Sequence, residues 1–348
     1  MKLRTLSLAL CIAAVAPFAV AQSAGTKAIA IKSEAANFQV KTVAQGLENA
    51  WGMAFLPDGS MLVTERAGRM RIVTADGKLG APLSGLPKIL AQGQGGLLDV
   101  VLAPDFATSK KIYFSYSEPG EGSLNSTAVS FATLNGNKLE NVTRIFSQKP
   151  KVSSTNHFGS RLVWAPDGTL FVTLGDRYSE KDKAQTLDNH QGKVVRINAD
   201  GSAPKDNPFV KTPGALPEIW SYGHRNMQGA AINPLTKELW TGEHGPQGGD
   251  ELNIDRAAKN YGWPVITYGE NYGGGKIGEG TTKAGMEQPN YKWVPSIATA
   301  GFIFYTGDKF PKWKNNILLT SLREKTLVRL VVDGEKAVSY THLRAHET

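Results

Sequence analysis

The sequence predicts an all-β protein folded as a β-propeller, and three observations support this fold class. An apolar strand, a short turn and a second strand recur along the 348 residues. No stretch keeps the 3.6-residue periodicity of an amphipathic helix, while 37 glycines and 18 prolines interrupt the chain throughout. The repeats follow at intervals of about 45–70 residues, a spacing typical of propeller blades. A β-sandwich with many hairpins is the alternative, and the repeated period favours the propeller.

The repeats predict the elements in chain order. In the first four repeats, the turn between the two strands begins at Pro57, Pro104, Pro166 and Pro234. Proline presets φ for such turns, and a following glycine accepts positive φ. Long insertions rich in glycine and proline should gather on one face and form a binding mouth. The repeats cover 51–73, 97–117, 161–176, 229–245 and 300–334, and the insertions cover 177–190, 202–217 and 269–292.

Residues 1–21 have the pattern of a secretory signal. Lys2 and Arg4 precede the apolar stretch 6–20, and small residues end the segment at Ala21. We expect cleavage after about Ala21, giving a periplasmic or secreted protein. The apolar stretch is short for a membrane span and no second one follows, so stable membrane insertion is not expected. Cys11 is the only cysteine, so the mature chain should contain no thiol.

The C-terminal end departs from the repeat pattern. We expect one propeller domain over 22–338, followed by a tail at 339–348 that does not look native. The segment 340–348 reads YTHLRAHET, which lacks the alternation of a strand. We therefore expect that the chain is C-terminally truncated, that its last blade is incomplete, and that it is weakly active or inactive.

Charge and motifs exclude several functions. The formal charge is +8, and removing Lys2 and Arg4 leaves 8 − 2 = +6. The basic residues are scattered without interleaved aromatics, which argues against nucleic acid, and a modest positive excess fits an anionic small ligand. No G-x-S-x-G elbow or nucleotide-binding glycine motif is present, and the histidines lack zinc-ligand spacing. A monomer and a homodimer are both compatible with the sequence.

Two residues form a candidate acid–base pair. His157 lies just before one predicted strand, and Asp176 ends the strand after it. Adjacent antiparallel strands could return both residues to the same rim, where the carboxylate would hold the imidazole tautomer and raise its basicity. A histidine hydrogen-bonded within a loop is an equal alternative. Gln94 lies among glycines that allow close approach of a ligand, although a simple loop explains it as well.

The stretch from residue 218 to 264 contains the densest set of ligand-binding side chains. Arg225 and Asn226 can donate together to carboxylate or quinone oxygens, although an arginine in a loop can also be a structural ion-pair partner. The segment HGPQGGDE (244–251) is the best metal candidate. Gly245 and Pro246 offer unobstructed backbone carbonyls, and Asp250 and Glu251 offer negative charge. Calcium prefers such a combination of oxygen ligands. The alternative is that these acids are solvated.

Seven motifs together resemble one family, the glucose/sorbosone dehydrogenases, which are soluble aldose sugar dehydrogenases that use pyrroloquinoline quinone. The resemblance runs in order from about residue 37 to 334. It implies a six-bladed β-propeller that binds the quinone on one face. The motifs are GQGGLL (93–98), NHFGSRLVWAPDG (156–168), LGDR (174–177), DNHQGKVVRINADG (188–201), YGHRN (222–226), EHGPQGGDELN (243–253) and NYGWP (260–264).

The resemblance implies a role for each candidate catalytic residue. His157 would be the general base that takes the proton of the sugar's anomeric hydroxyl, and Asp176 would orient it. Gln94 would lie beside the aldose substrate. Hydride would pass from the anomeric carbon to the quinone, while Arg225 and Asn226 hold the quinone oxygens and stabilise the developing charge.

The resemblance also implies calcium. The carbonyls of Gly245 and Pro246 would bind a calcium ion that polarises the cofactor as a Lewis acid. Asp250, Glu251 and Tyr261 match positions that bind a further, structural calcium.

Other positions match the family more weakly or depart from it. Trp293 and Ser296 match residues that pack against and hydrogen-bond the cofactor. Arg323 occupies a cofactor position that is often lysine, which keeps the charge but not the geometry. Asn156 stands where the glucose-specific branch has an acid, so the sugar preference is expected to be broad. The family's final Arg-x-Arg-Asp segment, which helps to hold the quinone, is not found in this sequence.

Two alternatives to an aldose dehydrogenase stay open at this point. One is a calcium-dependent propeller hydrolase such as a sugar lactonase, which would need more acidic ligands and no Arg225–Asn226 clamp. The other is a sugar-binding propeller without catalysis. The physiological sugar and the natural electron acceptor are not encoded in any motif.

Overall fold

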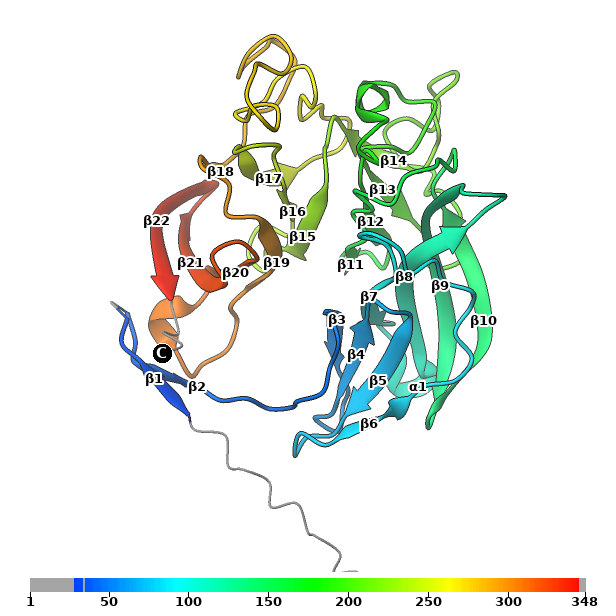
Figure 1. Ribbon diagram of the computed structural model, residues 1–348, viewed down its shortest axis with the longest axis vertical. Coiled ribbons are helices and arrows are strands. Elements are labelled where there is room, and N and C mark those ends of the chain that lie inside the picture. Colours follow the sequence, from blue (N-terminus) through cyan, green and yellow to red (C-terminus); the bar gives the residue numbers. More distant parts are fainter. Residues whose placement is uncertain (1–27, 34, 344–348) are drawn as a thin grey trace, which may run out of the picture.

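The computed structural model describes residues 28–33 and 35–343, and these residues form an all-β propeller (Figure 1). Five four-stranded antiparallel sheets follow one another around an axis. The predicted fold class is therefore confirmed. Five blades lie within the described residues, and the predicted sixth blade and truncation are not confirmed. The predicted signal segment, 1–21, lies outside the described ranges.

Within each blade the strands pair in chain order, and the first strand lies nearest the axis (Figure 1). Blade 1 contains β3 (Ala50–Phe55), β4 (Met61–Glu65), β5 (Arg69–Val73) and β6 (Leu79–Pro82). Blade 2 contains β7 (Leu97–Leu102), α1 (Phe106–Ser109), β8 (Lys111–Pro119), β9 (Asn125–Asn135) and β10 (Lys138–Ser147). Blade 3 contains β11 (Leu162–Trp164), β12 (Leu170–Leu174), the 3₁₀ turn η1 (Lys181–Gln185), β13 (Lys193–Ile197) and β14 (Ile219–Tyr222). Blade 4 contains β15 (Met227–Ile232), β16 (Leu239–Glu243), β17 (Asp250–Asp255) and β18 (Tyr291–Trp293). Blade 5 contains β19 (Thr299–Phe304), the 3₁₀ turn η2 (Pro311–Trp313), β20 (Ile317–Ser321), β21 (Thr326–Asp333) and β22 (Lys336–Leu343).

The predicted proline turns join the first and second strands of blades 1 to 4. In blade 3, the side chain of Asp167 accepts the backbone N–H of Thr169 at 2.9 Å, which closes the turn that begins at Pro166. This is the local hydrogen bond that favours aspartate in such turns. The turn fixes the pairing of β11 with β12, and this pairing positions the residues at the opposite rim.

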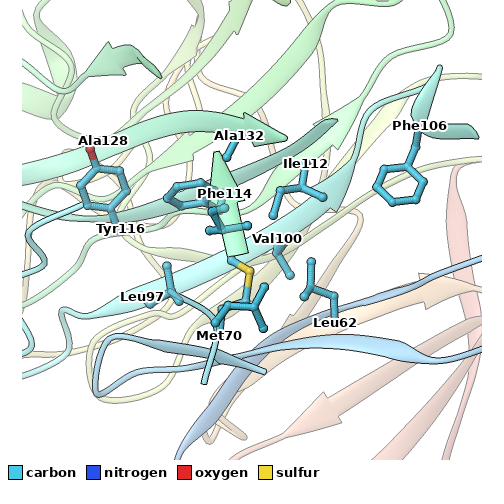
Figure 2. Packing of buried hydrophobic residues seen from close by; sticks show 12 residues of the cluster. Leu62, Met70, Leu97, Val100, Phe106, Ile112, Phe114, Tyr116, Ala128 and Ala132 are labelled. Atoms are coloured by element: carbon cyan, nitrogen blue, oxygen red, sulfur yellow. The ribbon is translucent and has the colours of Figure 1, made fainter. Parts of the chain in front are cut away.

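The hydrophobic cores lie between neighbouring blades. Leu62 and Met70 of blade 1 are fully buried against Leu97 and Phe114 of blade 2 (Figure 2). Similar clusters join blade 2 to blade 3, blade 3 to blade 4, and blade 4 to blade 5. Each blade therefore buries its apolar faces against its neighbours, as expected for a repeat architecture. The packing between blades determines where the rim loops lie.

The N-terminal segment connects blade 5 to blade 1. Strand β1 (Ile29–Ile31) pairs with β2 (Phe38–Val40), and the Phe38 ring contacts Trp313 beside blade 5 with centroids 5.3 Å apart. Residues 41–49, which we call the strap, then lead to β3 (Figure 1). The strap borders an apolar cavity of about 420 Å³ on the face of blade 1 that points away from blade 2. On this face Met53 and Phe55 remain 52% and 64% exposed.

Strand β22 extends past the predicted domain boundary at residue 338. It runs to Leu343 and pairs with β21, so that Thr341 lies opposite Arg329. The ring of Tyr340 stacks on Tyr291 of blade 4, with centroids 5.9 Å apart. Within the described residues, β22 is the outermost strand of its sheet. Residues 344–348 of the predicted tail lie beyond the described ranges, so its origin stays a prediction.

Where the chain is described, no helix has the length and apolar character needed to cross a membrane.

Candidate active site

The pairing of β11 with β12 brings His157 and Asp176 together. The loop before β11 runs beside the end of β12, and the N–H of Ser160 donates to the carbonyl of Thr173 at 2.6 Å. As a result, Nδ1 of His157 lies 2.6 Å from Oδ1 of Asp176. Gly175 permits this approach, because a Cβ at position 175 would lie only 2.1 Å from the carbonyl oxygen of His157. The predicted juxtaposition on one rim is present.

The Asp176 carboxylate is held by three donors. Oδ1 accepts His157 Nδ1–H and the N–H of Tyr178 at 2.8 Å, and Oδ2 accepts the indole N–H of Trp263 at 2.8 Å. The carboxylate is buried, so these hydrogen bonds fix its orientation. Because Nδ1 of His157 carries the proton, Nε2 is the basic nitrogen of the neutral ring.

Burial and neighbouring charges lower the pKa of His157. Burial is the largest cause, because it disfavours the imidazolium. The hydrogen bond and charge of Asp176 act in the opposite direction, whereas the cations Arg225 and Arg177 lower the pKa further. The pKa therefore falls below its usual value near 6.5. The ring is neutral at pH 7 and can accept a proton.

Gln94 connects this pair to blade 2. The side-chain oxygen of Gln94 accepts the backbone N–H of His157 at 2.8 Å. The backbone N–H of Gln94 donates to the carbonyl of Thr155 at 2.8 Å. Gln94 also lines a cavity of about 300 Å³ together with Asn226 and His244. The sequence placed Gln94 near a ligand, and in the structure it also supports the backbone of His157.

Arg225 is held at the same rim by its backbone and its side chain. Its carbonyl accepts the N–H of Asp176 at 2.8 Å, and its N–H donates to the carboxylate of Glu243 at 2.6 Å. One guanidinium nitrogen donates to the carbonyl of His244 at 3.0 Å, and the group lies 5.3 Å from the Trp263 ring centroid. The charge is therefore fixed in place before any ligand binds.

Asn226 lies next to Arg225 and faces the neighbouring cavity. Its side-chain oxygen accepts the N–H of Gly159 and the amide of Gln228, both at 3.1 Å. With the oxygen occupied, the side-chain NH₂ is the group that Asn226 can offer to a ligand.

A cavity of about 340 Å³ brings these groups together. It is lined by His157, Asp176, Arg225, Pro246 and Trp263, with Tyr178 and Tyr272 among its other walls. This volume suits a small ligand. The same cavity is thus lined by the candidate base His157, by the cation Arg225 and by Pro246, which belongs to the turn predicted to bind a metal.

The turn at Gly245 and Pro246 is tightly folded. The N–H of Gly245 donates to Oδ1 of Asp250 at 3.0 Å, and a Cβ at position 245 would lie 2.2 Å from the Gly248 carbonyl oxygen. In the described part of the chain, neither the Gly245 nor the Pro246 carbonyl accepts a hydrogen bond. Two free carbonyls from one turn fit the oxygen-ligand preference of calcium.

Asp250 supports this turn from behind. Its second oxygen accepts the hydroxyl of Ser296 at 2.8 Å and the N–H groups of Ile297 and Thr299 at 3.1 and 3.3 Å. The Ser296 carbonyl in turn accepts a guanidinium N–H of Arg323 at 3.0 Å. Both oxygens of Asp250 are therefore engaged by protein donors. Ser296 and Arg323 join the site through this chain of contacts from blade 5.

Glu251 is a half-buried acid that lies beside a second acid, Glu243. It lies opposite Glu243 in the β16–β17 pair. Burial raises the pKa of Glu251 to about 8, and the charges of Glu243 and Asp250 add to the effect. A bound cation would favour the ionised form of such a carboxylate. Among the described residues, no three His, Cys, Asp or Glu side chains cluster as a metal site, so a cation here would also need backbone oxygens.

Tyr261 lies beside this region, and its hydroxyl is engaged by other partners. It borders a cavity of about 10 Å³ together with Glu251. Its hydroxyl donates to the Ile254 carbonyl at 2.5 Å and accepts the N–H of Arg256 at 2.8 Å. The Tyr261 hydroxyl is thus engaged, and its backbone carbonyl is the atom that remains for a metal.

Trp293 is the predicted residue that the structure places elsewhere. It is buried in the core between blades 4 and 5, with its ring 4.8 Å from that of Tyr291. Trp293 does not line the cavity of about 300 Å³ or the cavity of about 340 Å³. Sequence reasoning in turn missed Trp263, Tyr178 and Arg177, although each lies within or next to a motif that contains a predicted residue.

Any turnover that uses His157 and Asp176 should fall about tenfold in kcat when Trp263 is replaced with Phe. The substitution keeps an aromatic ring beneath Arg225 but removes the donor to Asp176. A hydrogen bond to a charged group contributes about 1.5–3 kcal/mol. Trp240→Phe is the matched control, because the Trp240 indole nitrogen is buried without a partner in the described residues. Steady-state kinetics on both variants check this, and equal kcat values for the two would contradict it.

Comparisons with known proteins identify the family of this chain. The family model described as "Glucose / Sorbosone dehydrogenase" matches residues 47–348. An aldose sugar dehydrogenase of Escherichia coli is 48% identical over 306 residues, covering 86% of this chain and 82% of that protein. A crystal structure of a glucose dehydrogenase superposes with a TM-score of 0.84 and 47% identity, covering 86% of this chain and 87% of that one. The PQQ-bound aldose sugar dehydrogenase from Streptomyces coelicolor has a TM-score of 0.72 and 28% identity, covering 87% of this chain and 83% of that one. This chain belongs to the glucose/sorbosone dehydrogenase family.

Proposed function

We propose that this protein oxidises the anomeric hydroxyl of aldose sugars to the lactone, with pyrroloquinoline quinone as the hydride acceptor. One observation carries the proposal: His157, held by Asp176, opens into the cavity that Arg225 and Pro246 also line. The relatives support it, since one is an aldose sugar dehydrogenase and another is an aldose sugar dehydrogenase in a PQQ-bound form.

In this proposal His157 removes the hydroxyl proton through Nε2. The resulting imidazolium is stabilised by the Asp176 carboxylate 2.6 Å from Nδ1, and that carboxylate is fixed by the Trp263 indole and the Tyr178 N–H. As the proton leaves, the electron pair of the anomeric C–H bond departs with the hydrogen as hydride. Pyrroloquinoline quinone, when bound, supplies the two-electron acceptor for this hydride.

The residues present fit such an anionic quinone. Arg225 offers a buried, pre-positioned guanidinium, and Asn226 offers an amide NH₂ to the adjoining cavity. Arg323 adds an exposed positive charge from blade 5. Ser296 supports the metal turn through Asp250 and need not touch the cofactor. Trp293 is left without a direct role, because its ring belongs to the core between blades.

The metal part of the proposal rests on backbone oxygens. The free carbonyls of Gly245 and Pro246 would hold calcium next to the cofactor, where the ion polarises it. Asp250 would keep the turn folded. Glu251 and the Tyr261 carbonyl would hold a further cation, which would relieve the unfavourable burial of the Glu251 carboxylate.

The substrate class is proposed to be aldoses in general. Asn156, the residue before His157, is an amide and adds no charge beside the sugar. The oxidation is proposed to take place after export, on the basis of the secretory pattern of residues 1–21.

A reconstitution assay tests the function directly. Purified apo-protein is mixed with pyrroloquinoline quinone and Ca²⁺, then with a panel of aldoses and an artificial electron-accepting dye. We expect dye reduction that needs all three additions and is suppressed by a calcium chelator. If quinone binds tightly but no aldose reduces the dye, the dehydrogenase assignment is wrong.

Activity should depend on pH through His157. Its pKa in the folded protein lies below the usual value near 6.5. Because the neutral ring is the active base, kcat/KM should be flat above about pH 7 and fall as the pH drops through this lowered pKa. A pH–rate profile checks this. An acid limb lying above pH 7 would contradict the inferred environment of the imidazole.

A further inference from the structure

Arg177 is a fully buried cation beside His157, and the oxidation proposed above gives it no role. Its guanidinium lies 3.9 Å from the ring centroid of Phe158. Its hydrogen-bond acceptors in the described residues are all uncharged oxygens. A buried charge is costly unless it is well satisfied, so this arrangement calls for a specific explanation.

The hydrogen bonds of Arg177 converge on the backbone just before His157. Nε donates to the Asn156 carbonyl at 3.0 Å, and Nη2 donates to the Ser154 carbonyl. The guanidinium also binds Asn125. Nη2 donates to the side-chain oxygen of Asn125 at 2.7 Å, and Nη1 donates to its backbone carbonyl at 3.3 Å. The guanidinium thus ties the 154–156 turn to blade 2 through β9.

Three consecutive residues surround the imidazole. Asp176 binds Nδ1, Arg177 holds the preceding backbone, and the ring edge of Tyr178 contacts the imidazole with centroids 5.3 Å apart. His157, Arg177 and Tyr178 all have left-handed backbone angles, with φ of +49°, +61° and +66°. Such angles are uncommon outside glycine and are kept only where the surroundings fix them. Arg177 fixes the turn before His157 together with Gln94, which bonds the Thr155 carbonyl and the His157 N–H.

The positive charge of Arg177 also lowers the pKa of His157. Burial lowers the pKa of Arg177 to about 10, which leaves it charged at pH 7. In the described part of the chain, the other charged or titratable groups around His157 are Asp176, Arg225, His244, Tyr178, Tyr272 and Lys181. Of these, Asp176 favours the imidazolium, whereas Arg225 and Arg177 oppose it.

We propose that Arg177 is a positioning residue for His157: its guanidinium holds the turn that orients the imidazole toward Asp176. This inference rests on the proposed role of His157 as the base. A purely structural Arg177 would affect only the amount of folded protein.

Two substitutions separate geometry from charge. Arg177→Gln removes the charge and most donors, so we expect at least a tenfold loss of kcat with the KM for aldose changed less than about threefold. Because a repelling cation is gone, the acid limb of the pH–rate profile should move to higher pH by about 0.5–1 unit. Arg177→Lys keeps the charge but not the planar fork, so it should leave the acid limb in place and still lower kcat at least threefold.

Arg196→Gln is the matched control. Arg196 is also buried and hydrogen-bonded, but its partners are Asp167 and Asp206 at the far end of blade 3. This variant should lose thermal stability without moving the acid limb. If it shifts the limb as much as Arg177→Gln does, the effect is not specific and the proposal is wrong.

A second readout does not depend on turnover. The imidazole C–H signal of His157 can be titrated by NMR in the apo-protein, with His157→Ala used to assign the peak. The proposal expects the His157 pKa to rise in Arg177→Gln, and an unchanged pKa with an unchanged kcat overturns it. If the wild-type protein reduces no dye, the proposed oxidation fails, while this titration still decides the role of Arg177. If Arg177→Gln does not fold, Arg177→Lys decides: wild-type kcat in that variant overturns the proposal.

Discussion

Replacing His157 with Ala should lower kcat by about 10²–10⁴-fold, the contribution typical of a positioned general base. Among the described residues that line the cavity, His157 is the one imidazole, and the buried Asp176 carboxylate holds it. Quinone affinity should stay within about threefold of wild type, because the cofactor is proposed to be held by Arg225 and Asn226. Single-turnover dye reduction and fluorescence titration with the quinone measure the two quantities separately.

His190→Ala provides the control for losing a buried imidazole. His190 is as buried as His157 and packs against Phe146, but it does not line the candidate site. This variant should unfold at a lower temperature and keep the wild-type kcat per folded molecule. Retained turnover in His157→Ala would remove that residue from the role of base, whatever the control does.

Replacing Gly245 with Ala should abolish calcium-dependent loading of the quinone. A Cβ at this position would lie 2.2 Å from the Gly248 carbonyl oxygen and 2.4 Å from the Gly249 carbonyl carbon, and both are backbone atoms that cannot rotate away. The turn must open, which separates the two free carbonyls from each other and from Asp250. Overpacking of this kind costs about 1–3 kcal/mol. Calcium titration followed by the shift in Tm, with and without quinone, measures the loss.

Gly280→Ala is the matched glycine substitution. A Cβ at position 280 meets no atom within 4 Å, and Gly280 lies in the same blade, in the long insertion between β17 and β18. This variant should bind calcium and quinone as the wild type does. If Gly245→Ala keeps a normal calcium response, the carbonyls of this turn are not the metal ligands.

The fold and part of the site could be predicted because they depend on local patterns. The strand–turn–strand repeats identify the first strands of all five blades, and antiparallel pairing places His157 near Asp176. The role of Trp263 could not be found in this way. Its indole reaches Asp176 across 87 residues of sequence, and that contact depends on how blade 4 packs against blade 3.

Trp293 and β22 show where side-chain patterns carry less information. Trp293 was assigned from its place in a motif, but its pairing with Asp250 in β18 directs the ring into the core between blades. The segment after residue 338 lacks alternation, yet β22 continues to Leu343 because the backbone of β21 offers it hydrogen-bond partners. Side-chain patterns do not report such backbone pairing.

The hydrogen bonds that build the site are also bonds between blades. Gln94 to His157 joins blade 2 to blade 3, Trp263 to Asp176 joins blade 3 to blade 4, and Thr299 to Asp250 joins blade 4 to blade 5. The same three hydrogen bonds therefore contribute both to the geometry of the site and to the stability of the packing between blades. By thermodynamic linkage, a ligand that requires all three contacts must also hold the blades together, so saturation should convert stepwise melting of neighbouring blades into a single cooperative transition.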